Sequence, residues 1–161
     1  MCNFFSLIAT KDNIYYDIML DGHSDIIEKF KIREKTGENF NIAKIEITPP
    51  NNNVFAKLKD WTFKIDEDVI PEWLDKTAIE KKVRAILKEI KNKYILENKK
   101  IDKIFDGRYW LKNSIIEQMS GSSQVNYMSG SSQVKEMFGS SFYKKENGIY
   151  TPNKDLKIIL L

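Results

Sequence analysis

Several features that mark common protein classes are scarce or missing in this chain of 161 residues. Cys2 is its one cysteine, so no disulfide can form within the chain. The one histidine, His23, cannot complete a familiar zinc pattern with that cysteine, so we predict no metal site and no cofactor. No apolar run approaches the roughly 20 residues of a membrane span, and the start lacks a secretion signal. These absences predict a soluble, cytoplasmic protein without a membrane partner.

The motifs of common enzyme classes are missing as well. The sequence contains no glycine-rich phosphate loop, serine nucleophile elbow or dinucleotide fingerprint. Asp25 could orient His23 as a general base, but residues two apart at a helix start seldom face each other, which favours a loop or capping role. If Met1 is removed, Cys2 could act like the nucleophile of an N-terminal-nucleophile hydrolase. Those enzymes need a larger framework, so we favour a non-catalytic protein and keep a Cys2-dependent amidohydrolase as an alternative.

A nine-residue repeat is the most informative feature that is present. Residues 119–127 and 128–136 both begin Met-Ser-Gly-Ser-Ser-Gln-Val, and alignment on nine extends the register over residues 110–145. The aligned columns are Trp110, Met119, Met128 and Met137; Lys112, Gly121, Gly130 and Gly139; Ser114, Ser123, Ser132 and Ser141; and Ile116, Val125, Val134 and Tyr143. A fixed period of this length predicts stacked coils.

Chain length decides how such repeats can wind. Nine extended residues give roughly 30 Å of contour, and two sheets stand about 10 Å apart, so one nonamer is too short for a coil. We therefore predict a short, flattened β-solenoid with two nonamers per coil, the Val and Ser columns inward and glycine at the corners. Gln124, Asn126, Gln133 and Lys135 would face outward. The alternative is a Ser/Gly-rich linker. Calcium-binding nonamers have the same length, but they need Asp where this repeat has Ser, so we predict no calcium binding.

The pattern of the residues before the repeat predicts a separate α+β unit. Apolar, β-favouring runs at 4–8, 14–18, 43–48 and 61–65 predict a small, mostly antiparallel sheet. Ile26, Ile27 and Phe30 predict a short helix capped by Ser24 or Asp25. We predict an N-terminal α+β domain at 1–105 with one long amphipathic helix. A short β-solenoid tail would follow at 106–161, ending in a capping strand at 156–161.

The long helix has an apolar stripe and a basic surface. Ile79, Val83, Ile86, Leu87, Ile90 and Tyr94 recur at helical spacing after a capping-box pattern at 77–80. Residues 76–103 hold ten Lys or Arg against four Asp or Glu. The candidate partner-binding residues share one helical face: Lys81, Arg84, Lys88 and Lys91. They could contact an acidic partner or the phosphates of a nucleic acid or nucleotide, and the plain alternative is a solvated helix face.

Several segments together support a resemblance to a known family. They are the opening Met-Cys-Asn-Phe-Phe-Ser, residues 45–50, the run 61–73 from Trp61 to Trp73, Lys82-Val-Arg84 and the repeat. In these segments the chain resembles an uncharacterised family, common in bacteriophages and prophages, that joins a small N-terminal domain to a β-solenoid tail. This chain differs in having a brief repeat array. The resemblance implies a phage context and supplies no catalytic residues.

Three functions follow as hypotheses. We favour a non-catalytic phage accessory protein, in the cytoplasm of the infected bacterium, that binds a host protein or ribonucleoprotein. The host partner would belong to an anti-phage defence system, which makes the protein an anti-CRISPR-like inhibitor. The second is a structural or virion-associated protein that forms homo-oligomers through exposed ends of the solenoid. The third is the N-terminal-cysteine amidohydrolase.

Overall fold

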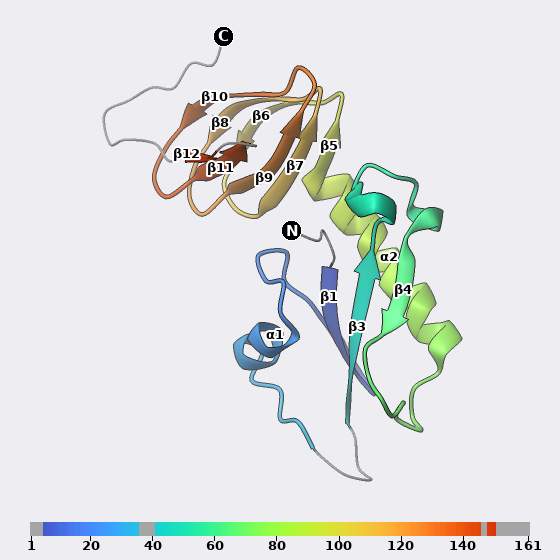
Figure 1. Cartoon of the computed structure of the whole chain (residues 1–161). Coiled ribbons are helices and arrows are strands. Elements are labelled where there is room, and N and C mark those ends of the chain that lie inside the picture. The colour runs from blue at the N-terminus through green and yellow to red at the C-terminus, as the bar shows by residue number, and fades with distance from the viewer. Residues whose placement is uncertain (1–4, 36–40, 146–147, 151–161) are drawn as a thin grey trace. The chain divides into compact units, whose positions relative to one another are not determined.

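The computed structural model describes residues 5–35, 41–145 and 148–150. The chain divides into two compact units, Met1–Glu89 and Ile90–Leu161. Helices and strands both occur, as the predicted fold class requires (Figure 1). Two predicted features, Cys2 with its possible nucleophile role and the capping strand at 156–161, lie outside the described residues.

A four-stranded antiparallel sheet forms the base of the first unit, in the order β2-β1-β3-β4. Its strands are β1 (Phe5–Thr10), β2 (Ile14–Tyr15), β3 (Ile42–Thr48) and β4 (Thr62–Ile65). The Thr10 backbone N–H donates to Asn13 O at 2.8 Å and closes the first hairpin. After β3, two prolines end the ladder because they have no N–H to donate. The short 3₁₀ turns η2 (Pro50–Asn52) and η3 (Leu58–Asp60) follow, and the predicted antiparallel sheet is confirmed.

Side chains alternate between the two faces of this sheet, and both faces are covered. On one face, Ile26 of α1 (His23–Lys29) packs in a buried cluster with Ile8 and Ile42. The residues of the other face, among them Leu7 and Ile45, are also fully buried. Burial on both sides makes the register strict, because a slip of one residue would exchange the two faces.

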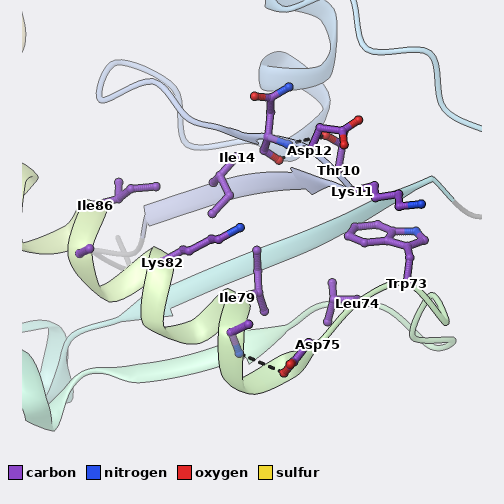
Figure 2. A pocket seen from close by; sticks show the side chains of 13 residues that line it. Thr10, Lys11, Asp12, Ile14, Trp73, Leu74, Asp75, Ile79, Lys82 and Ile86 are labelled. Atoms are coloured by element: carbon purple, nitrogen blue, oxygen red, sulfur yellow. Dashed lines mark hydrogen bonds between the residues drawn. The ribbon is translucent and has the colours of Figure 1, made fainter.

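The long helix α2 (Lys76–Tyr94) packs by its apolar stripe, as its spacing predicts. Ile79, Val83 and Leu87 are buried along one side, and α2 runs alongside the sheet in Figures 1 and 2. Among the described residues, neither helix combines the length and the apolar character that crossing a membrane requires.

Both helices begin at different caps from those predicted. The N-cap of α1 is Gly22, without a side-chain hydrogen bond, rather than Ser24 or Asp25. At α2 the cap is Asp75, whose Oδ1 accepts two backbone N–H groups at 2.9 and 3.0 Å. The box predicted at 77–80 therefore lies inside the helix. Polar residues crowd both starts, and local pattern alone cannot choose among candidates a residue or two apart.

The second unit contains two parallel sheets whose strands alternate along the chain. Sheet B has the order β12-β11-β9-β7-β5, and sheet C has the order β10-β8-β6. The strands are β5 (Ile95–Glu97), β6 (Lys100–Ile104), β7 (Arg108–Lys112), β8 (Ile115–Met119), β9 (Gln124–Ser129), β10 (Gln133–Met137), β11 (Phe142–Lys145) and β12 (Gly148–Tyr150). In the described part of this unit, only the last pair, β11 with β12, is antiparallel. From β5 to β11 each crossing between sheets takes a few residues, so consecutive strands lie in different sheets, whereas β11 and β12 lie in the same one.

The pairing register follows the repeat. In sheet C, Ile116 of β8 pairs with Val134 of β10, and in sheet B, Val125 of β9 pairs with Tyr143 of β11. In both pairs the partners are two nonamers apart along the chain.

Nearer the N-terminus the separation is shorter than two nonamers: 15 residues between β5 and β7 and between β6 and β8. Between β7 and β9 it is 16 or 17 residues, so Trp110 pairs with Tyr127 and not with Met128 of its predicted column. The period of nine does not predict β5 or β6, because their spacing does not keep it.

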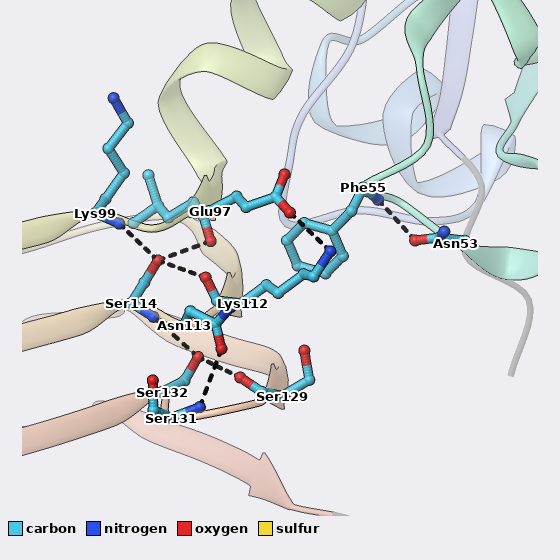
Figure 3. Close-up of polar contacts among 11 residues, drawn as sticks. Asn53, Phe55, Glu97, Lys99, Lys112, Asn113, Ser114, Ser129, Ser131 and Ser132 are labelled. Atoms are coloured by element: carbon cyan, nitrogen blue, oxygen red, sulfur yellow. Dashed lines mark hydrogen bonds and ion pairs between the residues drawn. The ribbon is translucent and has the colours of Figure 1, made fainter.

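Most described members of the inner columns of the repeat are buried as predicted, whereas Ser132 is half-buried. Ile116, Val125 and Val134 are at most 1% exposed, and Ser114 is fully buried. Figure 3 shows how this serine is satisfied: its Oγ accepts the Lys99 N–H at 3.1 Å, and its one proton is shared between the carbonyl oxygens of Leu96 and Lys112, each at 3.0 Å. At this turn the serine hydroxyl bonds backbone groups of both kinds, N–H and C=O. The column therefore needs a small side chain with a hydroxyl group.

The predicted corner column is confirmed at its three glycines. Gly121, Gly130 and Gly139 have φ of +64°, +62° and +69°, a region that L side chains seldom adopt. The fourth member differs from prediction, because the left-handed residue is Asn113, with φ +49°, rather than Lys112. Asparagine tolerates this conformation better than lysine does, since its short amide can bond locally.

Candidate functional site

The predicted basic surface is divided between two kinds of element. Seven of the ten Lys and Arg counted in residues 76–103 lie on α2. Lys100 and Lys103 lie on β6 and Lys99 precedes it, so the basic helix is shorter than the sequence suggested. The four candidate partner-binding residues are all on α2, with Lys81 and Lys88 exposed and Arg84 and Lys91 half-buried.

Arg84 uses its guanidinium within the protein. Its Nη1 and Nη2 donate to the carbonyl oxygens of Leu58 and Trp61, both at 3.2 Å. Its Nε donates to Glu80 at 2.8 Å, one turn back on the helix. Arginine suits this role because its planar fork can serve several acceptors at once. The hydrogen bonds to the two carbonyl oxygens connect α2 to η3. They account for an arginine at this position of the basic face without any binding role.

A groove lies beside Arg84 and contains a second predicted residue. Leu58, Lys59, Arg84, Leu87 and Lys88 line a cavity of about 420 Å³. Leu87 is buried, whereas Lys59 and Lys88 are exposed. We call this set the basic groove. It offers two cationic ammonium groups beside an apolar floor, which suits a partner that brings a carboxylate next to an apolar side chain.

Lys91 differs from the other three candidates. Burial lowers its pKa, and the negative charge of Glu97 opposes that shift. It also lies beyond Glu89, where the first unit ends. Lys91 is therefore not part of the basic groove. Helical spacing predicted Lys91 on the same face as the other three residues. Spacing gives the direction of a side chain around the helix axis and gives no information on what surrounds that side chain.

The other flank of α2 borders a second cavity, of about 470 Å³ (Figure 2). Its lining mixes the apolar side chains of Ile14, Ile79 and Ile86 with Trp73 and Lys82. At its edge, the Thr10 N–H donates to Asn13 O and the Ile79 N–H donates to Asp75 O. These backbone groups already have partners and stabilise local turns. The cavity lining mixes polar and apolar groups more evenly than that of a typical preformed small-molecule site.

One group of metal-ligand side chains is also brought together by the fold. His23, Glu46 and Asp66 each offer an atom within 4.8 Å of the others, and all three residues are half-buried. No motif in the sequence predicts this group, because its members lie on separate elements, far apart along the chain. Lys59 was missed for the same reason, since it precedes α2 and belongs to η3.

Comparison of the chain with family models, curated proteins and solved structures finds no match. The residues and their geometry are therefore the basis for inferring a function.

Proposed function

We propose that this protein is a non-catalytic binding protein that holds an acidic protein surface at the basic groove. One observation carries the proposal: exposed Lys59 and Lys88 line the same groove as the buried Leu87. The ammonium groups attract carboxylates and speed the encounter, and the apolar floor receives a neighbouring side chain. A solvated helix face would need no such floor.

The composition of the groove favours protein over nucleic acid. Among the residues that the structure describes, no aromatic side chain lines it, so bases would lack a stacking platform there. A phosphate held by the four-residue row would need the guanidinium of Arg84, which already donates to Leu58 and Trp61. A carboxylate beside an apolar residue needs only the lysines and the leucines.

The partner we propose is a protein or ribonucleoprotein of a bacterial anti-phage defence system, which makes the chain an anti-CRISPR-like inhibitor of phage origin. The resemblance of residues 61–73 and of the repeat to a phage family supports the cellular context. The groove supports the chemistry of the contact.

We also infer that β5 to β11 form a short β-solenoid. Alternation between sheets B and C and the pairing of strands two nonamers apart support this inference. It carries a second candidate function, self-assembly. Among the described residues, no strand pairs with β10 on its outer side, and an open edge invites a strand from another copy. Light scattering at micromolar concentration tests this candidate, because a strict monomer would remove it.

The binding proposal is tested by charge reversal with matched controls. Tagged Lys59→Glu/Lys88→Glu is compared with Lys76→Glu/Lys103→Glu, which changes the net charge equally at two exposed lysines outside the groove. Both variants and the original protein are used to capture partners from bacterial lysate, with and without nuclease. We expect a protein partner whose yield falls about tenfold, or about 1.4 kcal/mol, only in the groove variant.

Equal yields from both variants would remove the basic groove from the proposal, and a partner lost on nuclease treatment would replace protein with nucleic acid. The inhibitor role needs a further measurement. We expect the original protein and the control to raise the plating efficiency of phage on a defended host, and the groove variant to fail. No protection by the original protein would overturn the anti-defence role while leaving the binding result intact.

A further inference from the structure

Three side chains able to bind a metal converge on one face of the first sheet. His23 is the first residue of α1, Glu46 lies in β3, and Asp66 follows the last residue of β4. One ligand atom from each lies within 4.8 Å of the other two. The group therefore joins three elements that are separate in sequence.

The sheet register explains how the two carboxylates meet. Glu46 pairs with Lys64 across β3 and β4. The Asp66 N–H donates to Lys44 O at 2.8 Å, which continues the ladder beyond the end of β4. Residues two apart on a strand share a face, so Asp66 lies on the same face as Lys64 and Glu46. The carboxylates are diagonal neighbours by register and do not depend on a flexible loop.

The imidazole is oriented by a backbone group. The His23 Nε2 lies 3.1 Å from Ile45 O, and a carbonyl oxygen can only accept, so this nitrogen carries the proton. In the neutral tautomer with this bond, Nδ1 is the nitrogen that has the lone pair. Histidines that bind metals usually donate their other ring N–H to a carbonyl or carboxylate in this way, which holds the ring in place.

The ligand set indicates the class of ion. An imidazole with two carboxylates suits a first-row transition ion such as Zn²⁺, whereas Mg²⁺ and Ca²⁺ prefer oxygen ligands alone. Atoms bound to one Zn²⁺ at about 2.0–2.2 Å lie about 3–4 Å apart, so the observed group closes by side-chain rotations of about 1 Å. Three protein ligands would leave a fourth position for water.

The charges around the group do not prevent this closure. Glu46 and Asp66 repel each other at this separation, and a cation between them removes that cost. Lys64 now pairs with Asp66 at an exposed position, and its flexible stem lets the ammonium swing into solvent. Lys44 pairs with Glu34 at 3.1 Å and lies 3.9 Å from Glu67, so its charge is shared with carboxylates outside the group.

We propose that His23, Glu46 and Asp66 form a binding site for one Zn²⁺ ion that connects α1 to strands β3 and β4. The site is independent of the basic groove, since it shares no residue with it. Its failure and the failure of the binding proposal can therefore be told apart.

Calorimetric titration of Zn²⁺ into the full chain tests the proposal. The Cys2→Ser background removes the one thiol, and millimolar Mg²⁺ occupies nonspecific carboxylates. The ligand variants are His23→Gln, Glu46→Gln and Asp66→Asn, which keep size and shape. Asp68→Asn is the matched control, an exposed carboxylate just beyond the site. Circular dichroism verifies that each variant is folded.

We expect one Zn²⁺ per chain in the background protein and the control, with affinity lower by at least about tenfold in each ligand variant. Lys64→Ala should bind more tightly, because it removes the ammonium that competes for Asp66. Absence of Zn²⁺ binding would overturn the site. Unchanged affinity in Glu46→Gln and Asp66→Asn would also overturn it, because that result describes an ion held by a lone surface histidine.

Discussion

Arg84 and Lys88 lie one turn apart on α2 and carry the same charge, yet Arg84 is half-buried and Lys88 is exposed. The Arg84 guanidinium donates to Leu58, Trp61 and Glu80. Lys88 lines the basic groove with its ammonium exposed. The difference in exposure comes from the acceptors available to Arg84. The carbonyls of Leu58 and Trp61 come within reach of Arg84 because η3 packs against the helix. Mutagenesis of α2 should therefore treat Arg84 as a stability residue and Lys88 as a binding residue.

Tyr109 gives a pH-dependent prediction at the same scale. Its hydroxyl donates to Asp106 O at 2.9 Å, and its ring packs edge-on against Tyr94 at 5.3 Å. Burial, with smaller contributions from Tyr94 and Asp106, raises the pKa of Tyr109 to about 12. In the unfolded chain this phenol ionises near pH 10. Between pH 10 and 12 the folded state therefore holds the proton that the unfolded state has lost, and stability falls as pH rises.

Urea unfolding at several pH values between 9 and 12 measures this effect. We expect Tyr109→Phe to lose less stability across this range than the original protein, by at most about 1.4 kcal/mol per pH unit. Tyr127→Phe is the control, because Tyr127 is 43% exposed. Parallel pH profiles for the original protein and Tyr109→Phe would contradict the assignment.

At the scale of elements, the corners of the second unit give a matched pair of glycines. Gly130 and Gly139 have nearly equal positive φ, so an alanine at either position has similar backbone strain. Their surroundings differ. A Cβ on Gly130 would overlap Asn113 Oδ1, whereas the nearest atom to a Cβ on Gly139 is 3.7 Å away. Asn113 Oδ1 also accepts the Ser131 N–H at 3.2 Å, so the alanine would disrupt that bond (Figure 3).

We therefore expect Gly130→Ala to destabilise the protein by about 1–2 kcal/mol more than Gly139→Ala. Urea unfolding followed by circular dichroism measures the difference. Equal losses would show that backbone strain alone accounts for both glycines and that the Asn113 contact contributes nothing.

For the molecule as a whole, the pairing separation predicts the effect of removing repeats. Deletion of residues 119–136 removes two complete nonamers, and Met137 then follows Gln118 in the place of Met119. Gln124 of β9 pairs with Arg108 of β7 on one side and with Phe142 of β11 on the other. After the deletion Phe142 stands at the position of Gln124, so β11 would replace β9 beside β7 in sheet B. Deletion of residues 119–127 removes only one nonamer and moves every later strand to the opposite sheet.

We expect the two-nonamer deletion to unfold cooperatively at a higher urea concentration than the one-nonamer deletion, although it removes twice as much chain. The physical reason is that the longer deletion keeps β11 and β12 in the sheet that contains their partners. A one-nonamer deletion that is equally or more stable would contradict the importance of the two-nonamer separation.

Much of the architecture follows from local pattern. Alternating apolar residues predicted the antiparallel sheet, and the columns of the repeat predicted buried Val125 and Val134 and the corner at Gly130. These features succeed because burial and backbone conformation act on each residue through its near neighbours. Strands β5 and β6 were missed because they precede the repeat, and their partners are 15 residues away, three fewer than two nonamers.

By itself, the sequence determined the two kinds of periodicity in this protein: the alternation of strands and the apolar stripe of α2 in one part, and the nine-residue repeat in the other. Tertiary structure alone decided which charged residues meet. Lys59 reaches the groove of Lys88, and His23 reaches Glu46 and Asp66, across long stretches of intervening chain. Periodicity is a property of consecutive residues and can be read along the chain. A site formed by separate elements depends on sheet register and helix placement, for which these side chains carry no local signal.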